Sequence, residues 1–235
     1  MELTPAEKQF LMLVRGVKLY PKDSQTGEKV VANLKVLKKR ALETVLGFGR
    51  ILDPLTFNEE TITKLLGNGL VEQLETTFEL TSVGEDLAKR ARKEFLDESF
   101  SDDFKRLTTS KTLATIAKQV QGKDLGQFSM MTMPQLNKLL NVLQLTPDDT
   151  VIDLGCGLGK ITEYIFQVTQ VNMIGIDIAS TAIKLAQERT QDKKEKLNFR
   201  VDDMDDLAIP PASVDCIIAI DTLHFAEELE STIGQ

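Results

Sequence analysis

Histidine and cysteine are scarce in this chain of 235 residues, which contains one histidine and two cysteines. A structural zinc site needs a full set of nitrogen and sulfur ligands, and a disulfide framework needs several cysteine pairs. Cys156 lies in a glycine-rich segment and Cys216 in an apolar run, and the single histidine, His224, cannot complete a zinc site with them. We therefore expect neither a metal site nor a disulfide framework.

Long apolar runs are also missing, since no stretch approaches the roughly 20 residues that a membrane-spanning helix needs. Residues 1–10 lack the basic start and the apolar core of a secretory signal. The hydrophobic fraction of 42% and the charged fraction of 27% are ordinary for a globular protein, and the length is sufficient for two small domains. These features predict a cytoplasmic protein with no membrane partner.

An excess of basic residues is absent as well, because the formal net charge is −8. Such a balance opposes attraction to DNA or to an anionic membrane. Residues 1–150 are about neutral, so almost all of the negative charge lies in residues 151–235. We expect no binding to nucleic acid.

The first hundred residues are predicted to form helices around one short hairpin. Apolar residues recur at helical spacing over residues 30–45, and again over residues 62–66 after a predicted cap at Asn58. Residues 69–72 and 77–81 then predict two short strands. A helix should follow, because Ser82-Val83-Gly84-Glu85 has the pattern of a capping box and apolar positions continue to Phe95.

This order of elements, with the run at residues 65–72, resembles a winged-helix domain, here residues 1–100. The predicted recognition helix begins with Asn58, Glu59 and Glu60, and these carboxylates would repel phosphates. The basic group at residues 35–40 lies on a different helix, where we interpret it as a solvated face. We expect the domain to serve packing or homodimerisation and not DNA binding.

Residues 96–124 are polar and are predicted to form a connection with one helix near residues 111–120. The linker is accordingly placed at residues 101–126 and the second domain at residues 127–235. A helix over residues 135–145 should lead into its first strand, because leucines recur there on one helical face.

Strands and helices alternate through the second domain. The predicted strands are residues 151–154, 173–176, 197–201 and 214–220, and the predicted helices between them are residues 160–168 and 180–189. Alternation of this kind indicates parallel strands joined by crossover helices. The fold class is therefore α/β, with a Rossmann-like doubly wound parallel sheet preceded by a mainly helical domain.

A glycine at every second position follows the first of these strands. Val151 to Lys160 read Val-Ile-Asp-Leu-Gly-Cys-Gly-Leu-Gly-Lys, with glycines at Gly155, Gly157 and Gly159. Bare backbone at a turn from strand to helix leaves room for a nucleoside, and Asp153 is placed to meet a cationic ligand group. The segment resembles the S-adenosylmethionine-binding loop of class I methyltransferases.

A nicotinamide or flavin site is the main alternative, and its fingerprint requires Gly-x-Gly-x-x-Gly. The third glycine would fall at position 160, which is Lys160. Asp153 at the strand end would also place a negative charge beside a pyrophosphate. We therefore favour S-adenosylmethionine, a sulfonium cofactor that also carries an ammonium group.

The ends of the next two strands carry acidic residues. Asp177 ends the second strand, where a carboxylate can accept from both ribose hydroxyls, although it could also cap the following helix. Ile178 follows it in the same predicted site. The resemblance implies that Asp203 accepts from the adenine amino group while Met204 packs on the ring, but Asp202 stands where the family usually has glycine. The choice between Asp202 and Asp203 stays open, and so does a simple solvated turn.

The fourth strand and the residues after it resemble the part of the family that faces the methyl group. Asp221 is a site residue by its position in this motif, and His224 is a candidate base because its ordinary pKa suits proton transfer near neutrality. A loop histidine at the start of a helix is the more common role for a residue in this position. Cys156 contacts the cofactor as a small residue of the loop and not as a nucleophile. Residues 127–132 resemble a segment that folds over the cofactor in some family members, although their methionines could belong to the core.

A complete domain of this family continues through three further strands, so either this sequence is a fragment of a longer protein or a partner supplies the remainder. The first explanation is simpler, and we expect a fragment. The resemblance implies methyl transfer from S-adenosylmethionine, most simply to a small-molecule acceptor. Two alternatives stay open: a winged-helix regulator that senses S-adenosylmethionine, and a fragment that binds the cofactor without turnover.

Overall fold

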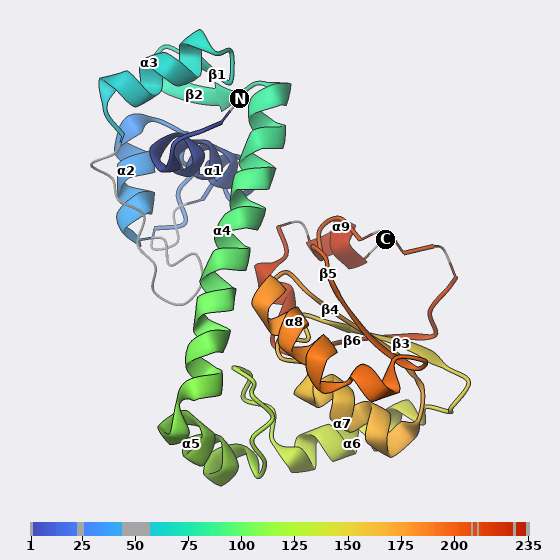
Figure 1. Cartoon of the computed structure of the whole chain (residues 1–235). Coiled ribbons are helices and arrows are strands. Elements are labelled where there is room, and N and C mark those ends of the chain that lie inside the picture. Colours follow the sequence, from blue (N-terminus) through green and yellow to red (C-terminus); the bar gives the residue numbers. More distant parts are fainter. Residues whose placement is uncertain are drawn as a thin grey trace. The chain divides into compact units, whose positions relative to one another are not determined.

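The computed structural model describes residues 2–22, 26–43, 57–207, 209–210, 212–227 and 229–233. The chain divides into two compact units, Met1–Ser99 and Phe100–Gln235. Each unit has an apolar core of its own. Figure 1 shows the helices and strands of the chain in sequence colours.

The described part of the first unit consists of helices around one hairpin. Its elements are α1 (Pro5–Leu19), α2 (Leu34–Glu43), α3 (Glu59–Gly67), β1 (Val71–Leu74), β2 (Thr77–Leu80) and the beginning of α4 (Ser82–Thr109). The predicted order of helices and strands is therefore observed. The helix predicted over residues 30–45 begins at Leu34, and its residues 44–45 lie outside the described residues.

Phe10 lies at the centre of the first core. Its ring centroid is 5.6 Å from that of Phe57 and 5.2 Å from that of Phe78, with the rings packed edge to face. Phe57 precedes α3 and Phe78 lies on β2, and all three side chains are buried. Because each buried aromatic ring removes a large apolar area from water, these contacts fix α1, α3 and the hairpin around one point.

Side-chain caps define the helix starts of this unit. The predicted cap at Asn58 is confirmed, since its side-chain oxygen accepts from the backbone N–H of Thr61 at 2.9 Å. The predicted capping box at Ser82 is wrong by one position. Thr81 is the cap, and its hydroxyl accepts from Gly84 N at 3.1 Å. Glu85 instead accepts from Arg15 Nε at 2.6 Å, because a cation of α1 faces it.

Helix α4 is much longer than the sequence predicted. It continues past Phe95 to Thr109, so the expected connection after Phe95 is helical over most of its first half. Leu96, Phe100 and Phe104 recur every fourth residue, which places them on one face of a helix. The polar residues between them hid this spacing. The next helix, α5 (Lys111–Gln121), is the one that was predicted there.

The second unit contains a parallel sheet with strand order β5-β4-β3-β6 in the described residues. The strands are β3 (Thr150–Leu154), β4 (Asn172–Asp177), β5 (Leu197–Val201) and β6 (Cys216–Ala219), and the helices around them are α6 (Met133–Leu143), α7 (Lys160–Thr169), α8 (Ser180–Arg189) and the short α9 (Leu229–Ile233). Leu154 of β3 pairs with Ile176 of β4 on one side and with Ala219 of β6 on the other. The predicted Rossmann-like α/β class is confirmed.

Helices cover one face of this sheet. Apolar side chains of α6, α7 and α8 pack with Val151, Met173 and Leu197 into the main core of the unit. The opposite face carries a smaller cluster around Ile152 and Ile176, packed against the chain segments that follow β5 and β6. The strands are thereby held at fixed register, with their carboxyl ends at one edge.

Candidate cofactor site

The strand order reverses between β3 and β6. β3 is followed by β4 and β5 on one side, whereas β6 lies on its other side, so the loops after β3 and β6 diverge. In open parallel sheets, ligands bind at the carboxyl ends of the strands where the order reverses. The predicted site residues lie at or just beyond these strand ends.

The glycine loop after β3 is packed tightly by the chain itself. Gly155, Gly157 and Gly159 have φ angles of 74°, 54° and 67°, which L-residues rarely adopt. A Cβ on Gly155 would lie 2.0 Å from Oγ1 of Thr222, and one on Gly159 would lie 2.3 Å from a ring carbon of Phe199. The glycines therefore leave room for neighbouring side chains of the chain itself. The sequence analysis explained them only by the space that a nucleoside needs.

Backbone and carboxylate bonds hold the loop at the end of β4. The N–H groups of Gly155 and Cys156 both donate to the carbonyl of Ile176, at 2.8 and 3.0 Å. Asp177 accepts from Gly157 N at 2.7 Å through Oδ2 and from Ala179 N at 2.8 Å through Oδ1. Asp177 thus joins the glycine loop to the start of α8, as the helix-cap interpretation predicted, and the ribose contact stays a prediction.

Asp153 lies beneath the loop, where its side chain is 3% exposed. Thr162, on the first turn of α7, donates from its hydroxyl to Oδ2 of Asp153 at 2.6 Å. Burial raises the pKa of Asp153 to about 6; the bond from Thr162 acts against this shift, and the charge of Asp177 adds to it. Thr162 was missed in the sequence analysis. A threonine among the apolar residues of the predicted helix is a signal of such a bond, and the structure shows that this threonine is fully buried.

Cys156 is a thiol and not a thiolate. Burial raises its pKa well above the ordinary value, and the nearby charges of Asp177 and Asp153 raise it further. The Sγ atom lies 3.8 Å from the carbonyl oxygen of Gly157. This agrees with a space-filling role in the loop, because the thiolate is the nucleophilic form.

The acidic run after β5 divides into different roles. Asp202 pairs with Arg200 at 3.2 Å, and Asp203 accepts from Asp205 N at 3.1 Å. Met204 packs into the apolar cluster on the sheet face. Asp205 accepts from Glu227 N at 3.0 Å and from the hydroxyl of Thr232 at 2.8 Å, so it anchors the last described segment. Asp205 was missed because one acidic residue of a run looks like another.

Segments from both ends of the second unit meet beyond β6. Asp221 has a φ of 53°, and its Oδ2 accepts from the backbone N–H of Met130 at 3.0 Å. Met130 belongs to residues 126–132, which we call the strap. His224 follows on the surface, with its ring centroid 4.0 Å from that of Phe225.

The strap lies against the glycine loop. A Cβ on Gly126 would be 2.9 Å from the side chain of Leu158, and the ring centroid of Phe128 is 5.1 Å from that of Phe104. Gln121 Nε2 donates to the carbonyl of Ser129 at 2.8 Å. Ile178 is half-buried just after β4. The structure therefore brings Asp153, the glycine loop, Asp177 and the strap together, with Asp221 tied to them through Met130.

Residues 151–234 match the family described as methyltransferase domain. The chain is 37% identical over 93 residues to ribosomal RNA small subunit methyltransferase A of Dehalococcoides mccartyi, covering 39% of this chain and 30% of that protein. It is 29% identical over 92 residues to phosphoethanolamine N-methyltransferase of Triticum aestivum, covering 39% and 18%. The chain spans less than a third of the length of the curated relatives that it matches.

A solved S-adenosylmethionine-dependent methyltransferase from Geobacter sulfurreducens, in complex with S-adenosyl-L-homocysteine, aligns at 20% identity with a TM-score of 0.38, covering 44% of this chain and 42% of that one. The family match and the methyltransferase relatives agree with the predicted enzyme class, and S-adenosylmethionine is the cofactor expected for such a domain. Among the described residues, no helix is both long and apolar enough to cross a bilayer.

Proposed function

We propose that the chain binds S-adenosylmethionine at the carboxyl edge of β3 and transfers its methyl group to a small-molecule acceptor. The bond from Gly157 N to Oδ2 of Asp177 carries this proposal, because it joins the glycine loop to the acidic end of β4 where the strand order reverses. Both groups belong to the segment that matches the methyltransferase family.

The chemistry of the side chains at this edge fits the cofactor. S-adenosylmethionine carries a sulfonium, an ammonium, ribose hydroxyls and an adenine amino group, which all favour acceptors or negative charge. Carboxylates of Asp153, Asp177, Asp203 and Asp221 stand at or after the ends of the four described strands. The same carboxylates would repel the pyrophosphate of a dinucleotide. This set of carboxylate acceptors therefore supports a cationic nucleoside ligand.

Each predicted contact receives a role in this proposal. Asp177 accepts from the ribose hydroxyls, since it ends β4 at the edge of the sheet where the glycine loop lies. Asp203 takes the adenine amino group, because Asp202 is already paired with Arg200 at 3.2 Å. Met204 and Ile178 line the adenine, and the loop atoms of Gly155, Cys156 and Gly159 contact the remainder.

The bound cofactor supplies an electrophilic methyl group, and the protein has to align an acceptor with it and exclude water. The strap suits this task because it packs on the glycine loop and is tied to Asp221. His224 is exposed, and we propose it as the base only for an acceptor that must lose a proton. Asp153 contributes negative charge beneath the cationic groups.

A small acceptor is favoured over RNA by charge. The relatives act, by name, on ribosomal RNA in one case and on phosphoethanolamine in another, so they do not fix the acceptor of this chain. The net charge of −8 opposes a polyanion, and most of it lies in the methyltransferase segment. A cytoplasmic location stays a prediction.

The first unit is proposed to act as a winged-helix-like module for packing or homodimerisation. Helix α3 begins with Glu59 and Glu60, and its only basic residue, Lys64, pairs with Glu60 at 2.7 Å. Such a helix has little attraction for phosphate, which argues against the DNA-binding regulator. Titration with duplex DNA at low salt tests this point, because a regulator would bind with a steep salt dependence.

Calorimetric titration with S-adenosylmethionine tests the cofactor site. We expect saturable binding that Asp177→Ala abolishes, with NAD giving no signal. Asp192→Ala is the matched control, because it removes an exposed carboxylate of η2 (Gln191–Lys193). Loss of binding in both variants, or binding of NAD instead, would contradict the proposal. Binding without turnover on any acceptor would identify the inactive alternative.

A further inference from the structure

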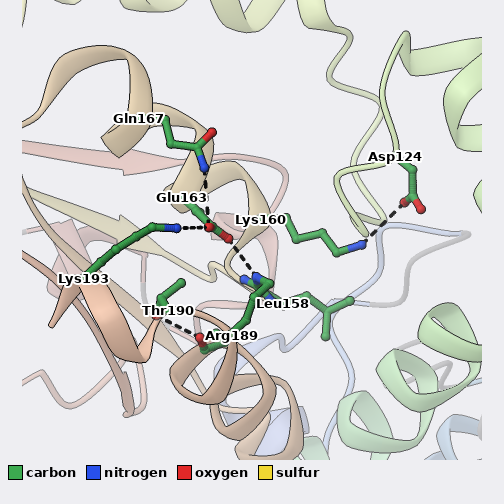
Figure 2. A network of polar contacts seen from close by, with 9 residues as sticks. Asp124, Leu158, Lys160, Glu163, Gln167, Arg189, Thr190 and Lys193 are labelled. Atoms are coloured by element: carbon green, nitrogen blue, oxygen red, sulfur yellow. Dashed lines mark hydrogen bonds and ion pairs between the residues drawn. The ribbon is translucent and has the colours of Figure 1, made fainter.

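A chain of polar contacts beside the glycine loop ends on the backbone carbonyl of Leu158 (Figure 2). Arg189, the last residue of α8, donates from Nη2 to this carbonyl at 2.7 Å and from Nε to Oε2 of Glu163 at 2.8 Å. Lys193 donates to the other carboxylate oxygen of Glu163, at 2.6 Å. One guanidinium therefore links α7, α8 and the glycine loop.

Glu163 is ionised and holds this arginine in place. Its side chain is 14% exposed, whereas those of Arg189 and Lys193 are 32% and 28% exposed. Burial alone would raise the pKa of Glu163, but the bonds and charges of Lys193 and Arg189 outweigh it and lower the pKa. The rigid fork of a guanidinium can bind a carboxylate and a carbonyl in fixed directions at the same time.

Leu158 is fixed from both sides. Its side chain is 2% exposed and packs with Phe104, Ala179 and Ala182, while its carbonyl accepts from Arg189. The same peptide unit carries the N–H of Gly159, which donates to Cys156 O at 2.9 Å. Rotation of the Leu158 carbonyl would therefore turn the loop at the residues proposed to contact the cofactor.

We propose that Arg189, oriented by Glu163, is a positioning residue that sets the affinity of the glycine loop for its ligand without touching that ligand. The inference rests on the proposed function, because the ligand is S-adenosylmethionine. Lys193 lies at the far end of the chain of contacts, where its ammonium group donates to Glu163, so it contributes charge to Glu163 but little to the loop.

The test compares Arg189→Met with Lys193→Met, since both remove one positive charge from Glu163 and only the first removes the bond to Leu158. We expect the dissociation constant for S-adenosylmethionine to rise about tenfold in Arg189→Met, or about 1.4 kcal/mol, and less than about twofold in Lys193→Met. Arg189→Lys should restore thermal stability through Glu163 but restore affinity only in part, because an ammonium lacks the fork.

Amide hydrogen exchange provides a readout that does not depend on the ligand. The N–H groups of Gly157 and Gly159 should exchange at least about tenfold faster in Arg189→Met than in Lys193→Met, while the amides of β3 stay unchanged. If Arg189 only stabilised the fold, Arg189→Met would speed amide exchange throughout the unit. The folded molecules would then bind S-adenosylmethionine with unchanged affinity.

These outcomes separate the two proposals. If the wild-type chain does not bind S-adenosylmethionine, the proposed function fails, and the exchange data alone decide whether Arg189 positions the loop. Equal affinity and equal loop exchange in Arg189→Met and the wild type would overturn the inference. Should Arg189→Met fail to fold, Arg189→Lys is compared with Lys193→Met in its place.

Discussion

The backbone N–H of Met130 donates a 3.0 Å hydrogen bond to Oδ2 of Asp221, a residue 91 positions later in the sequence. Asp221 adopts a left-handed φ of 53°, which is uncommon for a residue with a side chain. The bond ties the strap to the end of β6. Asp221 is therefore a structural tether in this chain, besides the ligand contact proposed for it.

Replacing Asp221 should release the strap. Asp221→Ala loses the bond to Met130 and tolerates the left-handed backbone less well, so we expect the free energy of unfolding to fall by about 1–3 kcal/mol. Asp221→Asn keeps an acceptor and is the matched control, with a change below about 0.5 kcal/mol. Urea unfolding measures both, and equal stabilities of the two variants would refute the tether.

Asp153 should make stability depend on pH. Burial raises its pKa to about 6 in the folded protein, whereas an unfolded chain has about 3.9. Between these values the folded state keeps a proton that the unfolded state has lost, so stability falls as the pH rises through this window. Above pH 6 the loss of unfolding free energy is complete, at about 3 kcal/mol.

Asp153→Asn removes this ionisation. We expect the unfolding free energy of Asp153→Asn, relative to that of the wild type, to increase by up to about 3 kcal/mol between pH 4 and pH 7. Urea unfolding at each pH measures this difference. Thr162→Val removes the bond that favours the ionised form and should move the window to higher pH. A difference between Asp153→Asn and the wild type that is constant with pH would contradict the prediction.

Gly155 should not tolerate a side chain. Gly155→Ala places a Cβ 2.0 Å from Oγ1 of Thr222 at a φ of 74°, so we expect a loss of about 2–4 kcal/mol in unfolding free energy. Gly16→Ala is the control, because Gly16 lies within α1 with no atom near the added Cβ, and alanine should stabilise the helix by about 0.5–1 kcal/mol. Chemical denaturation should therefore show shifts of opposite sign.

Asp205 should differ sharply from its neighbour Asp206. Asp205→Asn weakens the bonds from Glu227 N and Thr232, and we expect a loss of about 1–3 kcal/mol together with faster amide exchange at Glu227. Asp206 is exposed, so Asp206→Asn should change stability by less than about 0.5 kcal/mol. Similar behaviour of the two variants would support the simple solvated turn.

The sequence alone determined the elements of the second unit. Alternating apolar strands and amphipathic helices are local patterns, so the parallel sheet and helix α8 were predicted at or near their observed bounds. The glycine motif and the acidic strand ends indicated the cofactor class for the same reason, since each lies within a few residues of a predicted strand. The family match then agreed with that prediction.

Only the tertiary structure decided which partners these residues have. Thr222 against Gly155 and Arg189 on the carbonyl of Leu158 are contacts between elements that are not adjacent in the chain, and Thr162 meets Asp153 only because α7 packs back on β3. The length of α4 was also decided by packing, because Phe104 joins the core beside the glycine loop. Local periodicity determines helices and strands, but the partner of a buried polar or glycine position depends on which elements the fold brings together.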